Sequence, residues 1–105
     1  MIESLYNNSK TLTREIENAI YTMDSCRCEN YDRFHTLDNK TVRALELLKT
    51  LSTRMEISAH EQGDEKIVED WLKKTQEVKN KYQQYVSSFC LYSSKTSALI
   101  LFYFN

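Results

Sequence analysis

Three cysteines and two histidines are the residues of this chain whose chemistry could build a metal site or a nucleophilic centre. Cys26 and Cys28 stand one residue apart, whereas His35, His60 and Cys90 are scattered. Structural zinc sites usually pair their cysteines about two to four residues apart, and they do so twice. One C-x-C pair with dispersed histidines departs from that spacing. We therefore interpret Cys26 and Cys28 as thiols of a connecting segment and predict no metal site and no cofactor.

Cys90 is the remaining candidate for a nucleophile. It follows the last residue of an apolar helical pattern, where buried and unreactive cysteines are common. No residue pattern marks a general base or an oxyanion hole beside it, so we predict that the protein is not an enzyme and assign no catalytic residue. An odd number of cysteines is also a poor basis for a disulfide framework, which favours a reducing compartment.

Acidic and aromatic side chains offer two further possibilities. Glu65, Glu69 and Asp70 could pair for acid–base catalysis, but their spacing beside lysines is typical of a solvated helix face with ion pairs. Trp71 and the tyrosines could enclose a ligand, but at helical spacing such residues usually belong to a core. We predict the solvated face and the core.

Composition indicates one soluble helical domain. The chain has 105 residues, of which 41% are hydrophobic and 28% charged, and its net charge is −1. Nucleic-acid binding requires a basic surplus that releases counterions from phosphates, and this balance excludes it. The chain contains no proline, and Gly63 is its only glycine, so tight turns and phosphate-binding glycine loops are not expected.

Apolar residues recur every three or four positions in three stretches, which predicts three amphipathic helices. The first covers residues 3–23, the second residues 31–55 and the third residues 65–89. Their expected core positions in the first helix are Leu5, Leu12, Ile16, Ala19, Ile20 and Met23. Those in the second are Phe34, Leu37, Thr41, Ala44, Leu45, Leu48, Leu51 and Met55. Those in the third are Ile67, Trp71, Thr75, Val78, Tyr82, Tyr85 and Phe89.

Two polar stretches are predicted to connect the helices, residues 24–30 and residues 57–64. In the second stretch Ser58 and Glu61 have the spacing of a capping box, and Asp64 can cap a helix that begins just after Gly63. Packing three stripes against one another gives an all-α, antiparallel three-helix bundle over residues 1–89. Residues 90–105 have no matching periodicity, and we expect an apolar tail outside the bundle.

The ordered motifs of residues 1–89 resemble the N-terminal region of membrin-type SNARE proteins of the Golgi. The opening Ser4-Leu5-Tyr6-Asn7-Asn8 leads into a helix with Glu15-Ile16-Glu17. A leucine-rich heptad stretch follows at Leu45-Glu46-Leu47-Leu48-Lys49-Thr50-Leu51-Ser52. A polar connection and a third helix rich in glutamine and lysine complete the likeness. The family carries proline before its third helix, and this chain does not.

The resemblance implies a regulatory three-helix domain in vesicle transport between endoplasmic reticulum and Golgi, at the cytosolic face of those membranes. Its expected partners are helices of SNARE or tethering proteins, bound in a groove between two helices, with no nucleic acid and no small-molecule substrate. The family continues into a SNARE motif and a membrane anchor. We expect residues 90–105 to supply neither, which would leave the product cytoplasmic, with membrane association indirect or through the tail. The alternative is a helical adaptor or coiled-coil module unrelated to membrane fusion.

Overall fold

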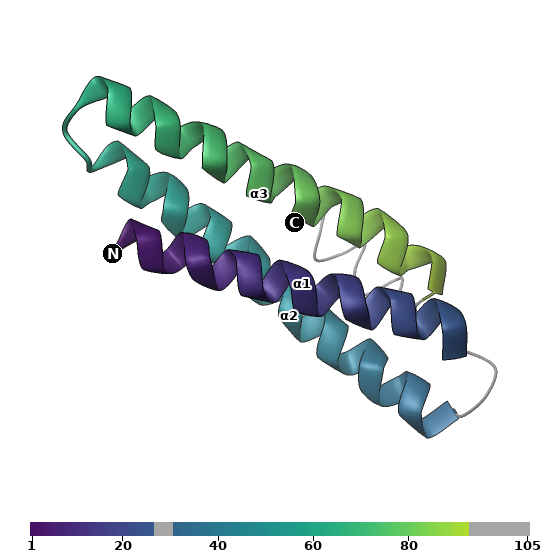
Figure 1. Cartoon of the computed structure of the whole chain (residues 1–105). Coiled ribbons are helices and arrows are strands. Elements are labelled where there is room, and N and C mark those ends of the chain that lie inside the picture. The colour runs from purple at the N-terminus through teal and green to yellow at the C-terminus, as the bar shows by residue number, and fades with distance from the viewer. Residues whose placement is uncertain (27–30, 93–105) are drawn as a thin grey trace.

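Three long helices form an elongated bundle (Figure 1). The computed structural model describes residues 1–26 and 31–92, with side chains for residues 1–23 and 35–90. Helix α1 spans Ile2–Cys26, α2 spans Tyr31–His60 and α3 spans Glu65–Tyr92. α1 and α3 run in the same direction and α2 runs opposite to both, and no strand occurs within these ranges. The predicted all-α, antiparallel three-helix bundle is confirmed.

The connection between α2 and α3 is shorter than the sequence suggested. α2 continues to His60 because nothing from Ile57 to His60 breaks a helix, and the backbone reverses only near Gly63, whose φ is +82°. Ser58 therefore lies inside α2, where its carbonyl accepts a hydrogen bond from the Glu61 amide at 3.2 Å, and the predicted capping box is wrong. The Asp64 cap is confirmed, since its carboxylate accepts a hydrogen bond from the Lys66 amide at 2.9 Å.

The core is centred on one face of α2, which contacts both other helices. Thr41, Leu48 and Met55 are fully buried, as their seven-residue spacing predicts. The predicted companion row is confirmed at Leu51, which is buried, as is Leu45 beside it, but Leu37 and Ala44 are only half buried. A second row of buried residues completes this face of α2, and it consists of Asp38, Leu45, Ser52 and Ala59.

The reason for this difference lies in the geometry of a helix. A heptad pattern permits a companion row on either side of the central one, because residues three and four positions away are both neighbours on a helix. In α2 the row that contains Ser52 and Ala59 is buried. The larger Leu37 and Leu51 then lie along the side of α2 next to α1.

The stripes of the outer helices largely match prediction. In α1, Leu5, Leu12, Ile16 and Met23 are buried, and Ala19 and Ile20 are half buried. In α3, the predicted residues from Thr75 to Phe89 are buried and Trp71 is half buried. Ile67 is 45% exposed, so its predicted place in the core is wrong. It lies in the first turn of α3, before the packed stripe begins.

Five buried hydroxyl groups are satisfied within their own helices. Each donates to a backbone carbonyl three or four residues earlier, at 2.6–2.8 Å. These residues are Ser9, Thr13, Thr41, Ser52 and Thr75. Because the hydroxyls have local partners, their burial does not leave an unsatisfied donor in the core.

The predicted boundary at residue 89 and the apolar tail remain predictions. α3 continues past Phe89 to Tyr92, and residues 93–105 lie outside the described part of the chain, as do residues 27–30 and the Phe34 side chain.

Leu47 and Leu48 provide a matched test of this core. Leu48 is fully buried and its neighbour Leu47 is 51% exposed. We expect Leu48→Ala to lower the free energy of unfolding by about 2–5 kcal/mol, because it leaves a cavity between helices. Leu47→Ala should cost less than about 1 kcal/mol. Urea unfolding followed by circular dichroism measures both, and equal losses would contradict the described orientation of α2.

Candidate functional site

The residues considered for chemistry are divided between the two ends of the bundle: His60 lies toward one end, and Cys26, His35 and Cys90 lie toward the other. His35 and His60 are exposed residues of α2, and they stand about 37 Å apart along its axis at about 1.5 Å per residue. Cys90 lies near the C-terminal end of α3, whereas His60 precedes the other end of that helix, so these two are similarly distant. Cys26 is the last residue of α1, and Cys28 lies outside the described residues.

Cys90 has the environment expected for it. The side chain is half buried against the core, and burial raises the pKa of its thiol above the ordinary value. A raised pKa reduces the thiolate fraction that a nucleophile requires. Among residues 1–23 and 35–90, whose side chains are described, no three His, Cys, Asp or Glu residues are grouped so as to hold a metal ion.

The acidic residues of α3 form a solvated face. Glu65, Glu69 and Asp70 are exposed. Glu69 pairs with Lys73 one turn later at 3.6 Å, with side chains 69% and 71% exposed. An exposed pair of this kind contributes little to stability, about 0.3–0.5 kcal/mol. This arrangement agrees with the solvated-face interpretation.

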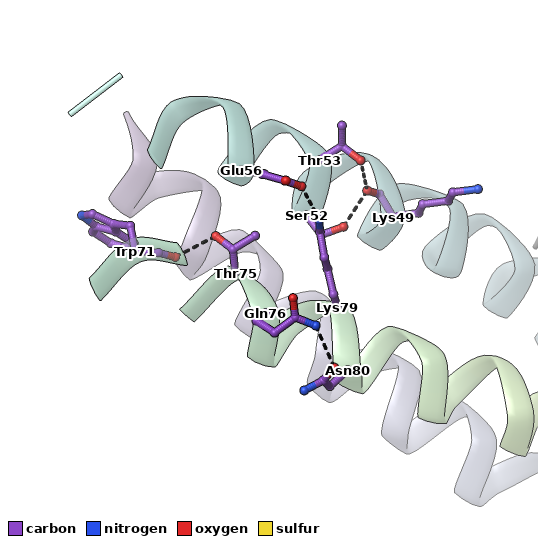
Figure 2. A network of polar contacts seen from close by, with 9 residues as sticks. All are labelled: Lys49, Ser52, Thr53, Glu56, Trp71, Thr75, Gln76, Lys79 and Asn80. Carbon is purple, nitrogen blue, oxygen red and sulfur yellow. Dashed lines mark hydrogen bonds and ion pairs between the residues drawn. The ribbon is translucent and has the colours of Figure 1, made fainter. Parts of the chain in front are cut away.

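Two polar contacts join α3 to the other two helices. The Tyr85 hydroxyl of α3 donates to the Glu17 carboxylate of α1. Burial, followed by this hydrogen bond and the negative charge of Glu17, raises the pKa of Tyr85 above its ordinary value. Figure 2 shows a polar contact between α2 and α3, in which Lys79 of α3 reaches the Glu56 carboxylate of α2.

The surface between α1 and α2 contains a groove that we call the α1–α2 groove. It consists of two hollows of about 370 and 240 Å³, which share Glu15. Leu12, Leu51 and the half-exposed Leu47 contribute apolar surface to the larger hollow, and Ala19 and Leu37 contribute to the smaller one. The polar lining consists of Asn8, Thr11, Glu15, Asn18, Thr22, Lys40 and Arg54.

Sequence reasoning expected a groove between two helices without identifying which pair or which residues form it. The available signal was Leu47, an apolar residue that falls outside both heptad rows of the second helix. Leu51 belongs to the core and Leu37 and Ala44 pack against it, and Leu47 beside them adds exposed apolar surface to α2. An exposed apolar side chain next to the core stripe is available for a further contact.

Comparisons with known proteins identify no relative. No protein-family model matches the chain, and no curated protein and no solved structure is significantly similar to it. None of the described helices combines the length and apolar character needed to cross a bilayer.

The Glu56–Lys79 pair should make stability depend on pH. The hydrogen bond from Lys79, together with its positive charge, lowers the pKa of Glu56 below the ordinary 4.5. A carboxyl whose pKa is lower in the folded state contributes stability above its unfolded pKa and loses it as the pH falls through the folded pKa. We therefore expect Glu56→Gln to lower the urea midpoint at pH 7 and to have no effect once the pH is below the folded pKa.

Lys79→Met is the matched variant for this measurement. It removes the partner that lowers the pKa of Glu56, so it should abolish the same part of the pH dependence. The two substitutions together should change the midpoint by less than the sum of their separate effects. A Glu56→Gln effect that is constant from pH 7 down to acid would show that the pair does not contribute in this way.

Proposed function

We propose that this bundle is a protein-interaction domain that binds an amphipathic helix of a partner in the α1–α2 groove. The observation that carries the proposal is an exposed leucine in this groove. Leu47 is half exposed beside Leu12 and Leu51, which are buried in the core of the bundle. An amphipathic helix places apolar side chains every three or four residues, which is the spacing at which a groove between two helices accepts them.

The dimensions of the groove suit such a ligand. Its lining on α1 extends from Asn8 to Thr22, which corresponds to about 21 Å, or about four helical turns. Acidic and basic residues both occur on its rim, at Glu15, Lys40 and Arg54. A rim of mixed charge favours a partner helix with polar edges and an apolar centre.

We further propose that the partner helix belongs to a SNARE or tethering protein of transport between endoplasmic reticulum and Golgi. The support for this step is the resemblance of the Ser4-Leu5-Tyr6 opening and the order of the three helices to membrin-type SNAREs. The alternative, an adaptor that associates with copies of itself, predicts a stable elongated dimer, and the mass of the protein in solution distinguishes the two.

Leu47→Glu provides the test of helix binding. Amphipathic helical peptides selected for binding to the protein from a displayed library should lose about ten-fold or more in affinity for this variant, because the charge would be buried under the bound helix. Fluorescence anisotropy measures the affinities, and perturbed amide resonances locate the bound peptide.

Ile57→Glu is the matched control for this experiment. Ile57 lies on the same helix, is 58% exposed and is absent from the groove lining. It introduces the same charge and should leave affinity unchanged. Peptides that bind equally well to the wild type and to Leu47→Glu would overturn the assignment of the groove.

A further inference from the structure

The opposite side of α1, where it faces α3, carries a different surface that we call the basic groove. It is a hollow of about 240 Å³. Its lining from α1 is Tyr6, Ser9, Lys10, Thr13, Arg14 and Glu17, and its lining from α3 is Glu77, Val78 and Lys81. No residue of this lining occurs in the α1–α2 groove.

Aromatic rings form one end of the basic groove. Tyr6 of α1 and Trp71 of α3 meet edge to face, with ring centroids 5.7 Å apart. The Lys74 ammonium lies 4.5 Å from the Trp71 centroid and 5.4 Å from that of Tyr6, and the Lys10 ammonium lies 4.4 Å from the Tyr6 centroid. Cation–π attraction holds both ammonium groups beside the hollow from opposite helices.

Cations outnumber acids on this surface. Lys10, Arg14, Lys74 and Lys81 are exposed, and none of them forms an ion pair with a carboxylate of the described residues. The lining includes two acids, Glu17 and Glu77. Glu17 keeps its negative charge when it accepts the hydrogen bond of Tyr85. Lys10, Arg14 and Lys81 against Glu17 and Glu77 give the lining a net charge of +1, and Lys74 beside it adds a fourth cation, on a chain whose net charge is −1.

We propose that the basic groove binds an acidic segment of a partner protein. The complementarity is electrostatic at Lys10, Arg14, Lys74 and Lys81, and it is apolar at the Tyr6–Trp71 pair. From Tyr6 to Glu17 the surface extends about 16 Å along α1, which matches about three helical turns of a bound segment. This short positive strip, with acids at both Glu17 and Glu77, fits one peptide segment better than an extended anionic surface.

A defined peptide set tests the proposal. The probe is a capped helical peptide with leucine at every third or fourth position and glutamate elsewhere, and its controls replace glutamate by glutamine or by lysine. We expect the glutamate peptide to bind about ten-fold or more tightly than the glutamine peptide at low salt. Its affinity should fall as the salt concentration rises from about 0.01 to 0.15 M, because the Debye length shortens from about 30 to 8 Å.

Two charge-reversal variants locate the binding surface. Lys10→Glu combined with Lys81→Glu should weaken glutamate-peptide binding about ten-fold or more. Arg43→Glu combined with Lys73→Glu makes the same change in net charge on exposed residues outside the basic groove and should preserve most of the affinity. Leu47→Glu, which lies in the α1–α2 groove, should also preserve it, so failure of one groove is distinguishable from failure of the other.

Three results would overturn the proposal. The glutamate and glutamine peptides could bind equally well, or both double variants could weaken binding to the same extent. Phosphatidylserine vesicles could bind the wild type, in a manner sensitive to Lys10 and Lys81, while the glutamate peptide does not. That last result would replace the protein partner by an anionic membrane.

Discussion

Burial of one face of α2 against both other helices is the constraint on which the rest of this structure depends. Thr41, Leu48 and Met55 exclude water from the middle of the bundle, and Leu45 and Ala59 complete the same face. A domain of this size has only a modest core, so most of its stability must come from such a continuous seam. The seam also holds α1 and α3 against α2 and next to each other, and the two grooves lie on the two sides of α1 as a result.

Much of the fold could be predicted from the sequence because the periodicity is long and uninterrupted. Gly63 and Asp64 mark the start of α3 through a positive φ and a side-chain cap, and both signals are local. Local signals could not decide between Leu37 and Asp38 for the companion row of α2. A carboxylate is an unexpected core residue by composition, yet Asp38 is fully buried.

The candidate sites were less accessible to sequence reasoning. A groove between helices was expected, but its lining combines residues from helices that are distant along the chain, such as Leu12 with Leu47. The pairing of Tyr6 with Trp71 has no sequence signature at all, because nothing in either helix specifies which turn of the other lies beside it. By contrast, the solvated face around Glu69 and Lys73 depends on one helix only, and its spacing was sufficient to predict it.

The buried hydroxyl groups bear on the axial position of each helix relative to its neighbours. A side chain such as Ser9 or Ser52 that bonds within its own helix keeps its partner when that helix slides past its neighbour. These two side chains therefore do not lock the axial position of one helix against another. The contacts that join helices are those of the Thr41 hydroxyl of α2 with the Met23 sulfur of α1, of Tyr85 in α3 with Glu17 in α1, and of Lys79 in α3 with Glu56 in α2. Tyr85 and Thr41 are themselves buried, so two of these contacts between helices also depend on the packing of the interior.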